Sequence, residues 1–417
     1  MKLNQNLSNK FIFHVDFDSY FVSVERKLNP KLKNKPVGIA ANSIKGAVTS
    51  VSYELKNKGI KITDKVYHVR QIVPDVVIVE PHFKEYRNLS SQIFNFVAQN
   101  YCKKIEVASI DEFYLDVSEI VSDTQGAIQL AKKIQQHILK KFDIPCTIGI
   151  SHTKFLAKMT TNCFKPFGLE YTSFDQILTK FGNLDLNKVH GIGNKTAQKL
   201  NEHGYYKYSD LYQKNISFEK INNILGAHGN KLLDDINGYG RAVVDNSLHE
   251  FKSIGHEVTM DPEFFYSWEG TTQILKDLCD KVSLRLKNRN LAGDVVVVLV
   301  RSFEKKWQIK QHKIDHFIYE ANDIYKHALP ILSELYFDDN FLGVGVRVTN
   351  LQNINIINKQ LNLFDNFQKD RNKISDILAS VAQQVGIGNV TRLSELKSKN
   401  KQKNVQNFFL EDDFFEE

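Results

Sequence analysis

The 417-residue chain has few cysteines, few prolines and no long apolar run. Its four cysteines are scattered without a C-x-x-C pair, so the sequence supports neither a disulfide framework nor a zinc site. No apolar stretch approaches the roughly 18 residues that span a bilayer, and the polar first ten residues carry no secretion signal. We therefore expect a cytoplasmic protein with reduced thiols and no membrane partner.

The composition is that of an ordinary soluble protein, with 42% hydrophobic and 25% charged residues. The length predicts two to four domains. The net charge of +7 is concentrated in residues 1–170, which carry 24 Lys and Arg against 16 Asp and Glu. The rest of the chain is nearly balanced. A local positive field indicates a polyanionic substrate for this segment.

Three carboxylates follow apolar, strand-like runs. Asp16 follows residues 11–15, and Asp111 with Glu112 follows residues 105–110. Each such acid taken singly is typical of a solvated turn residue or a helix N-cap. As a set of three, they are better explained by a shared divalent-cation site, because ionised groups in apolar surroundings need compensation and hard oxygen ligands favour Mg²⁺ or Mn²⁺. The chemistry indicated is phosphoryl transfer.

Hydrophobic periodicity predicts an α/β or α+β sheet with helices on one face in the first part of the chain. The predicted strands are residues 11–17, 76–79, 105–117 and 147–151, and the predicted helices are residues 66–72, 85–101 and 126–142.

Residues 172–240 are expected to be all-helical. Within them, Gly191-Ile192-Gly193 followed by Asn194-Lys195 has the spacing of a helix-hairpin-helix, whose glycines permit a tight turn and whose amides can bind a backbone phosphate. A simple glycine-containing turn between two helices is the alternative.

The last part of the chain is expected to form a second α/β unit and a loosely ordered tail. Its predicted strands are residues 253–260, 294–303, 306–313 and 342–350, with helices near 271–288 and 319–335 and a short helical stretch at 373–385.

Seven motifs over about residues 11–350 occur in one order: VDFDSYFVSVE, SYELKNKGI, EYRNLSSQI, SIDEFYLDVS, TIGISHTKFLAKMTTNCFKPFG, GIGNKTAQKL and FLGVGVRVTNL. In these motifs the chain resembles the Y-family translesion DNA polymerases of the bacterial DNA polymerase IV and UmuC-like group. The resemblance implies a multidomain fold with a polymerase palm, small fingers, an all-helical thumb and an α/β little finger. The implied boundaries are palm 1–19 and 76–170, fingers 20–75, thumb 171–244, linker 245–252, little finger 253–350 and tail 351–417.

The resemblance also implies two-metal nucleotidyl transfer with two Mg²⁺ ions, or Mn²⁺ in their place. By motif position, Asp16 and Asp111 would bridge both cations and Glu112 would complete the site that activates the primer 3′-hydroxyl. The main-chain carbonyl of Phe17 would be a further ligand.

Phe21 stands at the family's steric-gate position, where a large ring rejects a ribose 2′-hydroxyl. A core aromatic is the alternative reading. The residues at the family's triphosphate-contact positions are Ser50, Tyr53, Lys56 and Lys165. For Lys165, in Phe-Lys-Pro-Phe-Gly, a solvated loop lysine is the alternative.

The sequence departs from the family pattern in the fingers. Lys56 stands where relatives often have Arg, and lysine cannot form the bidentate fork with phosphate. Residues 62–65, Ile-Thr-Asp-Lys, replace a small residue, a hydrophobe and proline near the template base. Asp18 and Asp116 share the acidic motifs but are expected to orient neighbours rather than bind metal.

The segment Gln360-Leu361-Asn362-Leu363-Phe364 resembles the pentapeptide that binds the bacterial sliding clamp (its β subunit). In that mode an extended peptide places apolar anchors into a groove while the amide sets the register. A hydrophobic cluster docking on its own domain is the alternative. Residues 406–410 are a weaker second candidate.

The sequence is thus interpreted as a monomeric, DNA-templated DNA polymerase of the translesion type, with primer-template DNA, dNTPs and the sliding clamp as partners. Low fidelity and no proofreading are expected. Two other readings stay open: a palm-fold nucleotide cyclase or nuclease, and a non-catalytic DNA-binding mutasome subunit.

Overall fold

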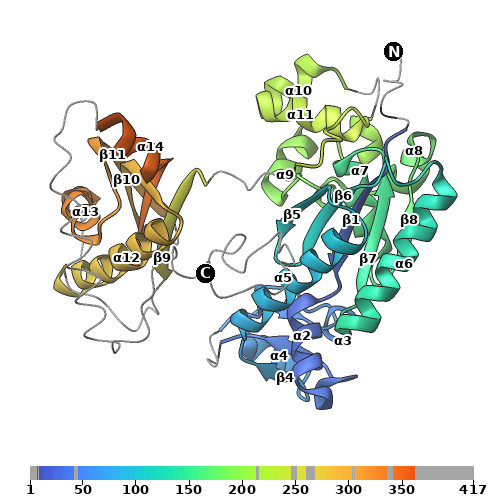
Figure 1. Ribbon diagram of the computed structural model, residues 1–417, viewed down its shortest axis with the longest axis horizontal. Coiled ribbons are helices and arrows are strands. Elements are labelled where there is room, and N and C mark those ends of the chain that lie inside the picture. Colours follow the sequence, from blue (N-terminus) through green and yellow to red (C-terminus); the bar gives the residue numbers. More distant parts are fainter. Residues whose placement is uncertain are drawn as a thin grey trace, which may run out of the picture. The chain divides into compact units, whose positions relative to one another are not determined.

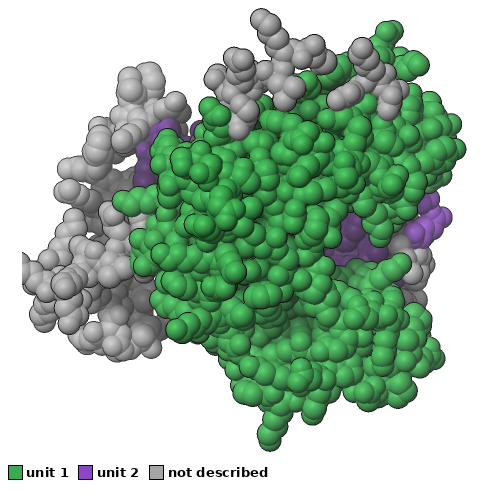
Figure 2. All heavy atoms as spheres, turned by 90° about the vertical axis from the view of Figure 1, so that its right-hand side faces the viewer, with its two compact units in different colours: residues 1–248, 404–417 green, residues 249–403 purple. Residues whose placement is uncertain are grey.

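The computed structural model describes residues 7, 9–41, 46–212, 216–245, 251–259, 268–302, 304, 306–335 and 341–361. The chain divides into two compact units, residues 1–248 with 404–417 and residues 249–403. Figure 1 labels many of their helices and strands, and Figure 2 shows one face of the first unit in green. Each unit has an apolar core of its own.

A five-stranded sheet lies at the centre of the first unit, in the order β5-β6-β1-β7-β8. Its strands are β1 Ile12–Phe17, β5 Ile105–Ser109, β6 Glu112–Asp116, β7 Cys146–Ser151 and β8 Leu169–Tyr171. β1 is antiparallel to β6 and β7, while β7 and β8 are parallel, so the sheet is mixed as predicted. The single strand predicted over residues 105–117 is wrong, because the chain reverses at Ile110 and Asp111 to form the β5–β6 hairpin.

The alternation of side chains along β1 separates the core from the site. Phe13, Val15 and Phe17 enter the main core, which is closed by helices α5 Phe83–Asn100 and α6 Thr124–Phe142 (Figure 1). These two helices therefore cover one face of the sheet. Ile12, His14 and Asp16 point to the opposite face.

Helix α7, Lys154–Phe164, packs on that opposite face. Its approach requires glycine at position 149 of β7, because a Cβ there would lie 2.3 Å from the carbonyl oxygen of Ala157 and 2.4 Å from the amide nitrogen of Thr161. This close packing brings Lys158 of α7 to the carboxylate of Glu112 in β6.

Residues 20–79 form a small mixed segment. Its elements are α2 Tyr20–Leu28, η1 Pro30–Leu32, β2 Val37–Ile39, β3 Ser50–Val51, α3 Tyr53–Lys56, α4 Val66–Ile72 and β4 Val77–Val79. The strands make a three-stranded sheet in the order β3-β2-β4. The expected palm location of residues 76–79 is therefore wrong: β4 pairs in parallel with β2. A short apolar run can pair with either sheet, and its sequence does not specify which.

The segment predicted to be all-helical, residues 172–240, contains helices as predicted, and the last of them ends at Ile236. The elements are η2 Phe174–Gln176, α8 Ile177–Phe181, η3 Leu186–Lys188, α9 Asn194–Glu202, η4 Tyr208–Leu211, α10 Phe218–Leu225 and α11 Ala227–Ile236. Their core includes Phe155, Leu156 and Met159 of α7. The helical segment thus completes its core with a helix of the central sheet and does not pack independently of it.

The second unit is a four-stranded antiparallel sheet in the order β11-β10-β12-β9. Its elements are β9 Ser253–Thr259, α12 Trp268–Asn288, β10 Leu291–Ser302, β11 Trp307–Ile318, α13 Ala321–Leu335, β12 Phe341–Asn353 and α14 Ile354–Leu361. α12 and α13 pack on the sheet and form its core.

The predicted end of this unit at residue 350 is wrong, because β12 continues to Asn353 and α14 follows directly. The Asn-rich composition hid both, since Asn is a poor former of helix and strand alike. The predicted helix at 373–385 and the motif at 406–410 lie outside the described residues. Among the described helices, none is both long enough and apolar enough to cross a membrane.

Candidate active site

Strand register brings Asp16 and Glu112 side by side. Asp16 stands directly opposite Glu112 in the antiparallel β1–β6 pair, and opposite Thr147 of β7 on its other side. Asp16 is next to the end of β1, whereas Glu112 begins β6. The sequence predicted that each of these acids follows the end of a strand. The structure instead places Asp16 near the end of β1 beside Glu112 at the start of β6.

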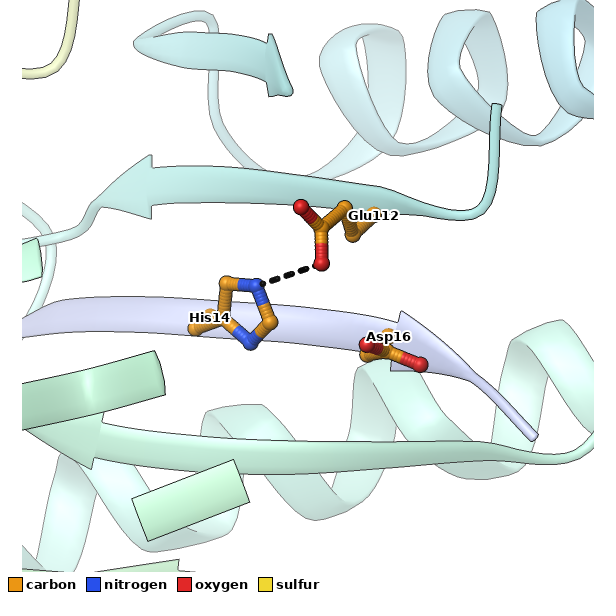
Figure 3. Close-up of side chains that lie close together, drawn as sticks. All are labelled: His14, Asp16 and Glu112. Atoms are coloured by element: carbon orange, nitrogen blue, oxygen red, sulfur yellow. Dashed lines mark ion pairs between the residues drawn. The ribbon is translucent and has the colours of Figure 1, made fainter. Parts of the chain in front are cut away.

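His14 joins these acids and was missed by the sequence reasoning. Ligand atoms of His14, Asp16 and Glu112 all lie within 4.8 Å of one another (Figure 3). The Nε2 atom of His14 is 3.4 Å from Oε2 of Glu112, and its Nδ1 is 3.0 Å from the hydroxyl of Thr161. Burial lowers the pKa of His14 to about 4, so the ring is neutral at pH 7. The signal was available, because period-2 alternation places His14 on the same face as Asp16.

Asp111 occupies the turn between β5 and β6, beside this group but not in it. Its carboxylate accepts a hydrogen bond from Ser109 Oγ at 2.5 Å. Its main-chain carbonyl accepts from the amide of Phe17 at 2.8 Å, which links the turn to the end of β1. Phe17 places its ring in the core and leaves only its backbone at the site. All three predicted carboxylates therefore lie at one edge of the sheet.

Two lysines of the α7 region pair with these acids. Lys165 donates to Oδ1 of Asp16 at 2.5 Å, and Lys158 donates to Oε2 of Glu112. Burial raises the pKa of Asp16 to about 7, which Lys165 opposes and Asp111 reinforces. Asp16 is thus a carboxylate that burial and its acidic neighbours disfavour in the ionised form.

Glu112 behaves in the opposite way. Burial alone would raise its pKa, but contact with His14 and Lys158 holds the pKa of Glu112 below its ordinary value. The site thus combines one readily ionised carboxylate with one that needs added positive charge. Hard oxygen donors clustered in this way fit a divalent cation of the Mg²⁺ or Mn²⁺ type.

The predicted triphosphate residues are near the acids but on a different segment. Ser50 is buried in β3, Tyr53 begins α3 and Lys56 ends it. The Lys56 ammonium lies 4.2 Å from the centre of the Tyr53 ring. Burial lowers the pKa of Lys56, and nearby Lys165 adds to this effect. The two lysines consequently belong to one region of positive charge.

Asp18 ties the segments around the site together. It is buried and accepts hydrogen bonds from the hydroxyl of Thr147 at 2.9 Å and the amide of Phe167 at 2.8 Å; the Tyr53 hydroxyl adds a third at 3.3 Å. These bonds join β1, β7, the loop after Lys165 and α3. The orienting role expected for Asp18 agrees with this geometry.

Asp116 also serves the fold rather than the site. It pairs with Lys10 at 2.9 Å and accepts from the amide of Ser118 at 3.1 Å. This agrees with the expectation that Asp116 orients its neighbours.

Phe21 lies on α2 with its ring half-buried. The ring stacks on Tyr86, with centroids 4.4 Å apart and planes 13° apart, and meets the edge of Phe83 at 5.8 Å. The hydroxyl of Tyr86 donates to the buried Glu25 at 2.5 Å. The ring is therefore held from behind by an aromatic platform anchored in the core.

The predicted helix-hairpin-helix glycines lie on an exposed turn. Gly191 has a φ of +83°, a left-handed conformation that favours glycine, and Gly193 is the N-cap of α9. Both glycines and Lys195 are exposed, while Ile192 between the glycines is buried. The turn is anchored by its apolar residue and presents its backbone to solvent.

The candidate clamp motif is only partly described. The backbone of Gln360 and Leu361 forms the end of α14, whereas Leu363 and Phe364 lie outside the described residues.

Comparison with known proteins places this arrangement in a family. Residues 15–162 match the model of the impB/mucB/samB family, residues 251–363 match its C-terminal domain, and residues 175–205 match its helix-hairpin-helix (HHH) motif. DNA polymerase IV of Oceanobacillus iheyensis is 32% identical over 359 residues, covering 85% of this chain and 84% of the relative. DNA polymerase IV 1 of Bacillus subtilis is 30% identical and covers 87% of each chain.

The similar solved structures are also Y-family DNA polymerases. A Y-family DNA polymerase chimera of Dbh and Dpo4 superposes with a TM-score of 0.73 at 28% identity, covering 82% of this chain and 99% of the other. The insertion ternary complex of Dbh DNA polymerase gives a TM-score of 0.57 at 29% identity, covering 82% and 99%.

These relatives and solved structures show that the chain is a DNA-directed DNA polymerase. The chain belongs to the impB/mucB/samB family of Y-family polymerases, in the DNA polymerase IV group, whose members are translesion enzymes.

Proposed function

We propose that this polymerase adds dNTPs to the 3′-hydroxyl of a primer, using Asp16, Asp111 and Glu112 to hold two Mg²⁺ ions. The observation that carries this proposal is the register of β1 and β6, which sets Asp16 beside Glu112 with Asp111 in the adjoining turn. Similar solved structures include ternary and binary complexes of Dbh polymerase, which supports primer-template DNA and a nucleotide as partners here.

The residues divide the work by position. Cations bound to these carboxylates would lower the pKa of the primer hydroxyl and neutralise charge that develops on the phosphates. Lys165, now paired with Asp16, would exchange this carboxylate for the triphosphate once a nucleotide arrives. Lys56, Tyr53 and Ser50 would contact the same phosphates from the fingers.

Phe21 supplies sugar selection in this proposal. Because Tyr86 supports its ring from one side, Phe21 cannot retreat in that direction when a ribonucleotide is placed against it. A 2′-hydroxyl would then clash with the ring. The exposed Gly191–Lys195 turn would bind the DNA backbone through its amides. Gly191 and Gly193 have no side chain that would keep a phosphate away from these amides.

We further propose that residues 360–364 tether the enzyme to the sliding clamp. The motif begins at the end of α14, the last described element of the second unit, which is where a short linear anchor can reach a partner. The near-balanced charge of residues 171–350 gives little general attraction to DNA, so tethering would raise the effective concentration of the enzyme at the primer.

Primer extension tests the central proposal. Purified protein with Mg²⁺, a primed template and dNTPs should extend the primer in a template-dependent way. Loss of a residue that only supports a metal ligand costs about 10- to 100-fold, so Asp111→Ala should reduce the rate by about 100-fold or more. Glu119→Ala, which removes an exposed acid of the same segment, should extend at the normal rate.

Absence of template-dependent extension by the unmodified protein would overturn the proposed function. Normal extension by Asp111→Ala would leave the polymerase activity intact but remove Asp111 from the metal site.

A further inference from the structure

Helix α7 carries two lysines, one turn apart, that reach across to two glutamates of neighbouring strands. Lys154 donates to both carboxylate oxygens of Glu106 in β5, at 2.6 and 2.8 Å. Lys158 donates to Oε2 of Glu112 in β6. The first pair lies away from the site, whereas the second lies inside it.

Lys158 is well enclosed in this position. Its side chain is only 13% exposed, and its ammonium is also 3.5 Å from Nε2 of His14. Among the described residues, the ion pairs of Glu112 are with Lys158 and, when its ring is protonated, with His14. Because His14 is neutral at pH 7, Lys158 supplies the positive charge that pairs with the Glu112 carboxylate.

The lysine and a divalent cation need the same carboxylate. Glu112 belongs to the group of His14, Asp16 and Glu112, and its Oε2 atom is both 3.4 Å from Nε2 of His14 and in contact with Lys158. A cation of charge +2 beside an ammonium of charge +1 is repelled, and the repulsion is strong where water is partly excluded. The lysine must move away, or the cation binds weakly.

In the proposed reaction, Lys165 can leave Asp16 and bind the triphosphate of the nucleotide. The proposed reaction gives Lys158 no such second partner. We propose that Lys158 is a positioning residue that occupies Glu112 in the substrate-free enzyme and keeps cation affinity at this carboxylate low. The inference rests on the proposed function, because it takes Glu112 as a metal ligand.

Low affinity before substrate binding has a consequence for the order of events. The ammonium of Lys158 holds the Glu112 carboxylate in place without a bound cation. Primer and triphosphate bring negative charge of their own, which favours cation binding and gives the displaced ammonium new partners. The site would then load fully only when the substrates are present.

Mn²⁺ binding to the full-length protein without DNA tests this inference. Free Mn²⁺ is measured by electron paramagnetic resonance during titration of the wild type, Lys158→Met and Lys154→Met. Removing the repulsion should tighten Mn²⁺ binding by on the order of tenfold in Lys158→Met. Lys154→Met removes an equivalent lysine one turn away and should bind like the wild type.

Two further variants locate the effect. The double variant Lys158→Met with Glu112→Gln should lose the gain, because the carboxylate that the lysine occupies is gone. Lys158→Arg keeps the charge and should bind Mn²⁺ like the wild type. If Lys158→Met does not fold, as judged by circular dichroism, Lys158→Gln replaces it and keeps a polar group at the position.

Unchanged or weaker Mn²⁺ binding in the folded uncharged variant would overturn the proposal, as would a gain that persists without the Glu112 carboxylate. The failure of the proposed function is seen separately, as lack of primer extension by the wild type. Mn²⁺ affinity can change or stay the same in either case.

Discussion

At the scale of single residues, the site depends on side chains that hold other side chains. Phe21 stacks on Tyr86, whose hydroxyl is bonded to the buried Glu25. His14 and Asp18 play comparable parts on the two sides of Asp16, since one contacts Glu112 and the other joins four segments. The acids are thus positioned by partners that are themselves buried.

Replacing Phe21 by Val should weaken discrimination against ribonucleotides. Removal of the ring opens the space that a 2′-hydroxyl needs, and a change of pocket shape of this size alters selectivity by about 10- to 200-fold. The ratio of kcat/KM for dNTP and rNTP insertion in single-nucleotide primer extension measures the effect.

Phe218→Val is the matched control, since Phe218 is an exposed phenylalanine on α10, away from the site. Its discrimination ratio should equal that of the wild type. Unchanged discrimination in Phe21→Val would show that another side chain selects the sugar.

At the scale of elements, α7 is the organising helix of the first unit. It packs on β1 and β7, completes the core of the helical segment, and carries Lys158 over Glu112. Lys165 follows at its C-terminus. A shift of this helix would therefore move both lysines and loosen the helical segment at the same time.

Gly149→Ala should destabilise this arrangement. The added methyl would meet backbone atoms of Ala157 and Thr161, which cannot turn aside as side chains can. Overpacking of this kind costs about 1–3 kcal/mol, and contact with backbone places the expected loss toward the upper end. Urea unfolding followed by far-ultraviolet circular dichroism measures the loss.

Gly126→Ala in α6 is the control. A Cβ at this position meets its neighbours at 3.4 Å or more, so it should be neutral or stabilising by up to about 1 kcal/mol. Both tryptophans, Trp268 and Trp307, lie in the second unit, so their fluorescence should report an unchanged transition in either variant. A Gly149→Ala protein as stable as the wild type would contradict the close packing of α7.

At the scale of the whole molecule, the chain forms two compact units, each with β-sheet structure of its own. The excess positive charge lies in residues 1–170, the segment that holds the carboxylates, while the second unit has its own sheet and core. The candidate clamp motif begins with the last two residues of α14, the last described helix of that second unit. Catalysis and tethering would thus reside in different parts of the chain.

Replacing Leu363 and Phe364 together by Ala should abolish stimulation by the sliding clamp. Linkage to a second binding site raises avidity by about 10²- to 10⁴-fold, and the apolar anchors supply that link. Synthesis on primed circular DNA with loaded clamp should fall by about 100-fold, whereas synthesis without the clamp should be unchanged.

Replacing Phe408 and Phe409 by Ala in the second motif serves as the control and should retain clamp stimulation. Clamp-dependent synthesis that survives loss of Leu363 and Phe364 would remove residues 360–364 as the tether.

The fold class, the polymerase function and the neighbourhood of the three acids could all be predicted from the sequence. These predictions rest on local features of the sequence, namely apolar runs that end in carboxylates, glycine turns and the order of motifs. Such features can be identified without knowing the tertiary structure. The β5–β6 hairpin was missed because its apolar pattern continues through the turn at Ile110 and Asp111. Strand β4 was assigned to the wrong sheet because pairing partners are chosen by packing.

What the sequence by itself determined is therefore the set of candidate site residues: Asp16, Asp111 and Glu112 in one part of the chain, with Phe21 and Lys165 nearby. Only the tertiary structure decided which atoms meet. The antiparallel register of β1 and β6 sets Asp16 beside Glu112, and the packing of α7 on β7 brings Lys158 to that carboxylate. Register and helix packing depend on contacts between distant segments, so no local pattern encodes them.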